Sequence, residues 1–158
     1  MAEEKTNVMR LLEQAGVPYV PYGYAHGKEP VDGVTVASIL GLDPQRVFKT
    51  LVTRGASGGF CVFVIPADGT LDLKKAARAA GEKNVEMIHV SEINKVTGYI
   101  RGGCSPLGMK KAYPTFLEET AQLWETILVS AGRIGAQVEL ESDRLLELCG
   151  GQYADLTV

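Results

Sequence analysis

One lysine lies within a run of apolar and β-branched residues. Residues 47–53 read Val-Phe-Lys-Thr-Leu-Val-Thr, a composition typical of a β-strand. Side chains alternate along a strand, so Lys49 shares a face with Val47 and Leu51, whereas Thr50 lies on the other face. In the general case such a lysine extends its stem to water at the end of the strand. A lysine held in a cleft could instead place its ammonium against an anionic or carbonyl group of a ligand.

The segment 98–108 is rich in glycine and could supply a second part of a site. It reads Gly-Tyr-Ile-Arg-Gly-Gly-Cys-Ser-Pro-Leu-Gly. Glycines such as Gly102 and Gly103 let backbone amides approach a ligand closely, and Pro106 stiffens the loop. Its N–H groups could form a cradle for an oxyanion or a phosphate, although the pattern matches neither a P-loop nor a dinucleotide fingerprint. An ordinary surface turn is the alternative interpretation.

The side chains of the common catalytic sets are not arranged here in their usual patterns. His26 and His89 have no spacing that suggests a metal pair, and the chain contains no Gly-x-Ser-x-Gly elbow. Cys104 has no histidine near it in sequence, which favours an inert thiol over a nucleophile. Cys61 is predicted to lie in the core, and Cys149, at a helix end, to be packed. Three cysteines are an odd count without a Cys-x-x-Cys pair, so we expect neither a zinc site nor a disulfide framework.

Basic residues are concentrated in two places, although the net charge of the chain is −3. Three lie on one predicted helix and four flank the glycine-rich segment: Lys74, Lys75 and Arg78, and Lys95, Arg101, Lys110 and Lys111. A polyanion could bind beside that segment, but with 16 basic and 19 acidic residues the whole chain does not attract phosphate at long range. For Lys74 and Lys75 a solvated helix face is an equally good interpretation.

The composition indicates a globular domain that can bury a core. The chain has 158 residues, of which 46% are hydrophobic and 22% charged, so intrinsic disorder and a fibrous design are excluded. No apolar run approaches the roughly 18 residues that cross a bilayer, and the first residues lack the apolar core of a signal peptide. We therefore expect one domain over residues 1–158 in a soluble, cytoplasmic protein.

Periodicity and capping signals predict the elements that must position these residues. Helices are expected over 7–15, 36–40, 73–80, 91–97 and from 142 or 143 to 149, and strands over 17–22, 47–53, 60–66, 85–89, 115–117, 127–130 and 138–140. The expected helix caps are Thr6 or Asn7, then Thr35, Asp72 and Ser91. Hairpin links are mixed with helical links, which predicts a mixed α/β domain with a curved, largely antiparallel sheet and surrounding helices rather than a doubly wound fold.

Taken together, the motifs resemble the YbaK/EbsC family of aminoacyl-tRNA deacylases. The resemblance is carried by residues 48–51 (Phe-Lys-Thr-Leu), 97–99 (Thr-Gly-Tyr), 102–111 (Gly-Gly-Cys-Ser-Pro-Leu-Gly-Met-Lys-Lys), 129–130 (Val-Ser) and 138–140 (Val-Glu-Leu), in the expected order over nearly the whole chain. It implies a curved mixed sheet with helices around it, related to the editing domain of bacterial prolyl-tRNA synthetase.

The resemblance also implies a set of site residues. The essential lysine of the family corresponds to Lys49, and the glycine-loop contact to Gly102 or Gly103. The residues expected to bind substrate are Tyr24, Thr50, Ser105, Pro106, Ser130 and Asp143. The residues expected to contact tRNA are Lys74, Lys75, Arg101, Lys110 and Lys111.

The implied function is trans-editing: hydrolysis of mischarged tRNA, most similar to the free-standing enzymes that remove cysteine from tRNA(Pro). A synthetase active site that selects by fit separates amino acids of similar size by only about 1–3 kcal/mol per methylene. A second, hydrolytic site is therefore needed to remove the wrong amino acid. In the route implied for the family, the thiol of the substrate cysteine attacks its own ester, so the enzyme need not supply a nucleophile. We expect neither a cofactor nor a metal. The expected partners are the acceptor end of an aminoacyl-tRNA and prolyl-tRNA synthetase, with neither DNA nor a membrane.

Three alternatives stay open at this point. The segment 29–32 (Glu-Pro-Val-Asp) lacks the aromatic residue that family members often carry there. The first alternative is therefore a related deacylase that hydrolyses Ala-tRNA(Pro) with a bound water as the nucleophile. A non-catalytic module that binds tRNA or a synthetase is the second, and a small-molecule binding protein the third. Having both Lys49 and the glycine-rich segment speaks against a pure binding module, which needs no oxyanion cradle.

Overall fold

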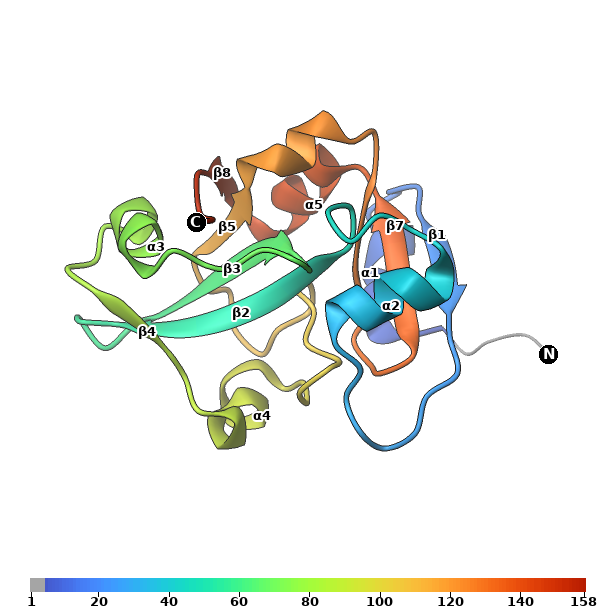
Figure 1. Ribbon diagram of the computed structural model, residues 1–158, viewed down its shortest axis with the longest axis horizontal. Helices are drawn as coiled ribbons and strands as arrows, with labels where there is room; N and C mark the ends of the chain where they lie inside the picture. Colours follow the sequence, from blue (N-terminus) through green and yellow to red (C-terminus); the bar gives the residue numbers. More distant parts are fainter. Residues whose placement is uncertain (1–4) are drawn as a thin grey trace.

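A computed structural model describes residues 5–158, which form two β-sheets surrounded by helices (Figure 1). The three-stranded sheet is antiparallel, in the order β1 (Val20–Gly23), β7 (Ala136–Leu140) and β6 (Ile127–Ser130). The five-stranded sheet has the order β4 (Val85–Met87), β2 (Phe48–Gly55), β3 (Phe60–Pro66), β5 (Thr115–Glu118) and β8 (Gln152–Ala154). Within it, β2 pairs antiparallel with β3 and β4, whereas β3–β5 and β5–β8 are parallel.

The two sheets meet at the start of β2. Val47, the residue before this strand, forms a parallel bridge with Leu128 of β6. Both side chains are buried in a small cluster with Ala37 and Ala67. This junction places β2 of one sheet beside β6 of the other.

Helices cover both sheets. Within residues 5–158, five are α-helical: α1 (Asn7–Gln14), α2 (Gly33–Leu40), α3 (Leu73–Ala80), α4 (Ile93–Thr97) and α5 (Ser142–Cys149). Two short 3₁₀ turns are η1 (Val90–Glu92) and η2 (Glu119–Leu123). Apolar residues of α1 and α5 pack into the largest core cluster together with residues of both sheets, and α3 covers the opposite face of β3 and β5. None of the helices formed by residues 5–158 is both long and apolar enough to cross a membrane.

The predicted mixed α/β class and the predominance of antiparallel pairing are confirmed, with local corrections. Helix α2 begins at Gly33, and its cap is Asp32, which accepts a hydrogen bond from the Thr35 N–H; the predicted cap at Thr35 was one turn too late. The region predicted as one helix with a cap at Ser91 is η1 followed by α4. Strand β8 was not predicted, because a three-residue segment offers no alternation to detect.

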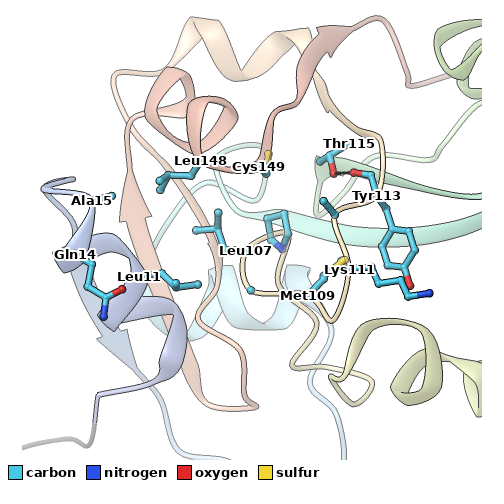
Figure 2. Close-up of a pocket in the computed structure, with 13 residues that line it drawn as sticks. Leu11, Gln14, Ala15, Leu107, Met109, Lys111, Tyr113, Thr115, Leu148 and Cys149 are labelled. Carbon is cyan, nitrogen blue, oxygen red and sulfur yellow. Dashed lines mark hydrogen bonds between the residues drawn. The ribbon is translucent and has the colours of Figure 1, made fainter.

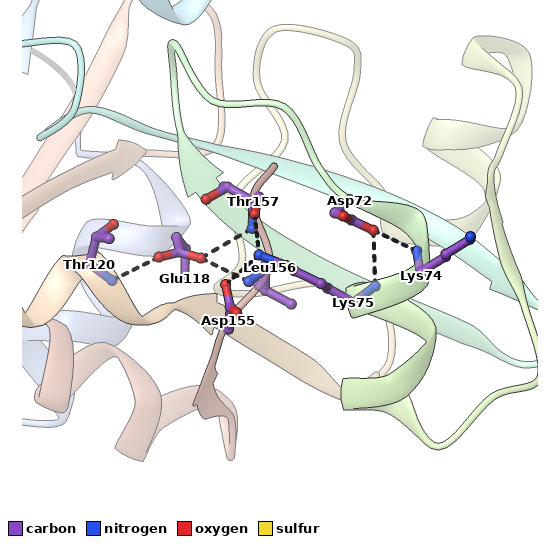
Figure 3. A network of polar contacts seen from close by, with 8 residues as sticks. All are labelled: Asp72, Lys74, Lys75, Glu118, Thr120, Asp155, Leu156 and Thr157. Carbon is purple, nitrogen blue, oxygen red and sulfur yellow. Dashed lines mark hydrogen bonds and ion pairs between the residues drawn. The ribbon is translucent and has the colours of Figure 1, made fainter.

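A buried carboxylate fixes the C-terminal segment to β5 (Figure 3). Glu118 is 2% exposed and accepts hydrogen bonds from the backbone N–H groups of Thr120, Leu156 and Thr157 at 2.9, 2.8 and 3.3 Å. Three donors satisfy a charge that would otherwise be costly to bury. The residues that follow β8 are thereby held against the edge of the larger sheet.

Candidate functional site

A cavity of about 430 Å³ lies beside the junction of the two sheets. Its walls come from the start of β2, the N-terminal part of α2 with the segment before it, the glycine-rich loop, β6 and β7. The volume lies within the range of roughly 300–1,000 Å³ that is typical of small-molecule sites. We call this space the junction cavity.

The exposure of the lining residues gives the junction cavity a floor and a mouth. Gln137 and Ser130 are 6% and 8% exposed and belong to the floor, with the buried Val36, Val47 and Phe48. The mouth is formed by the exposed residues Arg101, Pro30 and Asp32. A ligand that is attached to a large body must therefore enter with its smaller end first.

Lys49 contributes the cation of the junction cavity from the start of β2. Its Nζ donates a hydrogen bond to the carbonyl oxygen of Ala67 at 3.1 Å, and the Ala67 N–H donates to the Val47 carbonyl at 2.7 Å. The turn after β3 therefore anchors the ammonium. An ammonium has three donors, so two remain for a ligand.

The glycine-rich loop reaches the same cavity through Gly102 and is held by internal bonds. The Tyr99 hydroxyl donates to the Leu107 carbonyl, and burial raises the pKa of Tyr99 to about 12, so the hydroxyl keeps its proton at neutral pH. Gly102 has φ +86°, in the left-handed region, and a Cβ there would lie 2.7 Å from the Pro30 Cβ. Only glycine therefore lets the loop approach this wall without strain.

The two predicted loop glycines have different surroundings. The Gly103 N–H donates to the Ile100 carbonyl at 3.0 Å within the loop, and Gly103 is not among the residues that line the junction cavity. Within residues 5–158, the Gly102 N–H has no such acceptor. Of the two amides, that of Gly102 is therefore the one available to a ligand in this conformation.

Two residues that line the junction cavity each have a buried side-chain atom with no hydrogen-bond partner within residues 5–158. These atoms are the Thr50 Oγ1 and the Gln137 Oε1. Ser130 is nearby on β6, but its Oγ already accepts from the Gly132 N–H at 3.1 Å. The sequence analysis did not single out Gln137, whose signal was a polar residue between the apolar Ala136 and Val138.

Cys104 lines the junction cavity, and its environment makes it a poor nucleophile. Burial raises the pKa of the Cys104 thiol to about 11, against a smaller opposing effect of a hydrogen bond with Thr97. At neutral pH the thiol is therefore protonated, whereas nucleophilic attack requires the thiolate. This agrees with the interpretation of Cys104 as an inert residue.

Four residues predicted to bind substrate do not line the junction cavity. Tyr24 is buried, with its N–H bonded to the Gly135 carbonyl, and Ser105 is buried with its Oγ accepting from the Leu107 N–H. Asp143 lies at the start of α5, where it accepts a hydrogen bond from the Tyr153 hydroxyl at 2.5 Å. Pro106 lines a different cavity.

That second cavity, of about 470 Å³, lies along α1, the end of the glycine-rich loop and the end of α5 (Figure 2). Leu11 and Gln14 lie on one side of it and Tyr113 on the other. Most of its lining is apolar, and Lys49, Gly102 and Gln137 are not part of it. Of the two cavities, the junction cavity has the charged and polar groups that ester chemistry requires.

The basic residues predicted to contact tRNA are divided among several surfaces. Arg101 lines the mouth of the junction cavity, whereas Lys111 lines the second cavity. Lys110 donates to the Lys95 carbonyl at 3.3 Å. On α3, Lys75 is bonded to Asp155 and to the Thr157 carbonyl, and only Lys74 of the pair has no side-chain partner within residues 5–158 (Figure 3).

Comparison with known proteins places the chain among editing enzymes. Residues 29–148 match the model of the aminoacyl-tRNA editing domain. The chain is 50% identical, over 98% of its length and 94% of the relative, to an Enterococcus faecalis protein named "Putative Cys-tRNA(Pro)/Cys-tRNA(Cys) deacylase EbsC". It is 26% identical to the uncharacterized protein YwhH of Bacillus subtilis, over 70% of each chain.

A solved structure agrees with this relationship. The crystal structure of "a putative trans-editing enzyme for prolyl tRNA synthetase" superposes with a TM-score of 0.81 at 25% identity, covering 98% of this chain and 99% of that one. The editing-domain match spans the junction cavity from Pro30 to Gln137. The chain therefore belongs to the aminoacyl-tRNA editing domain family.

Proposed function

We propose that the chain is a free-standing deacylase that removes the amino acid from mischarged tRNA, with Cys-tRNA(Pro) as its main substrate. The observation that carries this proposal is the convergence of Lys49 and Gly102, from distant parts of the sequence, on one cavity. Family membership and the similarity to a relative named for Cys-tRNA deacylation support it.

The proposed chemistry uses the substrate's own thiol. The sulfur attacks the ester carbonyl, forming a C–S bond, while the bond from that carbonyl carbon to the ribose oxygen breaks. The thiol proton ends on the ribose hydroxyl, and the amino acid leaves as a thiolactone that water then opens. Because attack is intramolecular, holding the ester in one orientation accounts for much of the acceleration.

The residues of the junction cavity act on the ester oxygen in this proposal. As the carbonyl oxygen becomes anionic, the Lys49 ammonium and the Gly102 N–H stabilise it by charge and hydrogen bonding. The enzyme then needs no nucleophile of its own, in agreement with the protonated Cys104 thiol.

A panel of charged tRNAs tests the proposal. We expect the protein to release cysteine from Cys-tRNA(Pro) at least about a hundredfold faster than serine or proline from the corresponding esters, because these lack a thiol. S-methylcysteinyl-tRNA(Pro) should resist cleavage, since its sulfur cannot act as a thiolate.

Other results of the same panel would support the alternatives. Rapid cleavage of Ala-tRNA(Pro) would indicate a route through water. A protein that binds all of these tRNAs and cleaves none would be a non-catalytic module.

We further propose that the deacylase acts in the cytoplasm, where tRNAs are charged, and that prolyl-tRNA synthetase supplies the tRNA specificity. The support is the similarity to a trans-editing enzyme named for that synthetase. Adding prolyl-tRNA synthetase should therefore raise the rate on Cys-tRNA(Pro) more than on Cys-tRNA(Cys).

A further inference from the structure

Two residues that line the junction cavity, Thr50 and Gln137, each have a buried side-chain oxygen that the proposed chemistry does not use. Gln137 is 6% exposed, and its Oε1 has no hydrogen-bond partner within residues 5–158. Thr50 is half-buried, and its Oγ1 also has no partner there. Native proteins leave few such atoms unsatisfied, because a buried polar group without a hydrogen bond is costly. A ligand that carries N–H or O–H donors would satisfy both oxygens, because an amide carbonyl oxygen and a hydroxyl oxygen can each accept a hydrogen bond.

The fold holds Gln137 firmly in this place. It lies in β7, the central strand of the smaller sheet, where it pairs with Tyr22 of β1 on one side and with Ser130 of β6 on the other. A strand paired along both edges has little freedom to move. The carbonyl oxygen of the side chain is thus presented by a rigid element.

The depth of the cavity decides which part of the substrate meets these acceptors. The body of a tRNA cannot enter, so its terminal adenosine stays towards the mouth with Arg101, and the aminoacyl group reaches the floor with Gln137. The aminoacyl group has two kinds of donor, the α-amine and the thiol. The thiol is a weak donor and is required for the attack on the ester, whereas the amine has at least two strong N–H donors.

We propose that Gln137 and Thr50 form a subsite for the free α-amine of the aminoacyl group. This inference rests on the proposed deacylase function and adds a second selection to it. N-acylation turns the amine into an amide with one N–H and adds bulk at the floor, so peptidyl-tRNA and other N-blocked tRNAs are rejected. The deacylase would then spare tRNAs that carry a growing chain.

The test compares two substrates in the wild-type protein and in two variants, Gln137→Met and Thr50→Val. Wild-type protein should cleave N-acetyl-Cys-tRNA(Pro) at least about tenfold more slowly than Cys-tRNA(Pro). Gln137→Met keeps the length of the side chain but removes the acceptor, and it should lower kcat/KM on Cys-tRNA(Pro) about five- to tenfold. On the N-acetyl substrate it should change kcat/KM less than about twofold, and Thr50→Val should behave in the same way.

The control makes the same substitution outside the cavity. Gln122 is an exposed residue of η2 and does not line the junction cavity, so Gln122→Met should leave both rates unchanged. If Gln137→Met lowers kcat/KM on both substrates by the same factor, the role of Gln137 is structural and the proposed subsite is contradicted. The subsite is equally wrong if wild-type protein cleaves both substrates at one rate.

A binding measurement separates this inference from the proposed function. Adenosine that carries cysteine through a 3′-amide cannot be cleaved, and calorimetry should show at least about tenfold tighter binding with a free α-amine than with an acetylated one. This preference without any cleavage of Cys-tRNA(Pro) would overturn the deacylase and support the subsite. Cleavage of Cys-tRNA(Pro) together with equal binding of the two analogues would overturn the subsite alone.

Discussion

At the scale of single residues, charge and protonation state decide what the site can do. The Lys49 ammonium is fixed by the Ala67 carbonyl, so little ordering is needed when an ester binds. The Cys104 thiol shares the cavity but is kept protonated by burial. A fixed cation and an inert thiol suit a site that stabilises charge and leaves the attack to the substrate.

Removal of the Lys49 charge should abolish most activity without unfolding the protein. Lys49→Met keeps most of the apolar stem, and we expect deacylation of Cys-tRNA(Pro) to fall about 10²–10³-fold, the usual effect of losing one oxyanion donor. Thermal unfolding followed by circular dichroism should be nearly unchanged. Lys83→Met, at an exposed position, is the matched control, and activity of Lys49→Met within threefold of wild type would remove Lys49 from the mechanism.

The raised pKa of Cys104 predicts slow alkylation. With a pKa of about 11, the thiolate fraction of Cys104 at pH 8 is about two hundredfold lower than that of an ordinary thiol of pKa near 8.5. The thiolate fraction of Cys104 should increase about tenfold per pH unit until the pH nears 11. Iodoacetamide labelling of the folded protein, located by mass spectrometry, should follow this curve, and fast labelling of Cys104 at pH 8 would contradict it.

At the scale of elements, the junction cavity depends on close contact between two loops. The glycine-rich loop meets the segment before α2 at Gly102 and Pro30, and the Tyr99–Leu107 bond keeps the loop in one shape. Both segments line the cavity. The shape of the junction cavity therefore depends on packing between connecting segments as well as on the strands and the helix that line it.

A methyl group at Gly102 should disturb this contact. In Gly102→Ala, alanine would have to adopt a positive φ, and its Cβ would lie 2.7 Å from the Pro30 Cβ. We therefore expect a loss of about 1–3 kcal/mol in stability and a clear loss of activity. Urea unfolding and deacylation assays measure the two effects. The control, Gly27→Ala, has open space around its Cβ and should change neither; an unaffected Gly102→Ala would show that this wall is not rigid.

At the scale of the whole molecule, an acidic protein must bind a polyanion. With a net charge of −3, attraction to tRNA has to come from local residues, and the predicted basic residues do not form one continuous surface. Arg101 is the basic residue placed at the mouth of the junction cavity. We therefore expect weak binding of tRNA with a shallow dependence on salt.

Replacing Arg101 should affect binding rather than chemistry. Arg101→Ala should raise KM for Cys-tRNA(Pro), leave kcat nearly unchanged and reduce the slope of log K against log salt by about 0.7–0.9, the value for one lost phosphate contact. Filter binding at several salt concentrations measures the slope. Arg10→Ala on α1 is the control, and equal slopes for wild type and Arg101→Ala would show that Arg101 does not contact phosphate.

Local patterns in the sequence were enough to predict most helices and strands, the mixed α/β class and the two segments that carry Lys49 and Gly102. They succeed because caps and side-chain periodicity act over a few residues. The tertiary structure alone decided that the strands divide into two sheets joined at Val47 and Leu128, that Gln137 lies at the floor of the junction cavity, and that Asp143 lies elsewhere. These features depend on which strands pair and which faces are buried together, and such contacts join residues too far apart in the chain for any local pattern to specify.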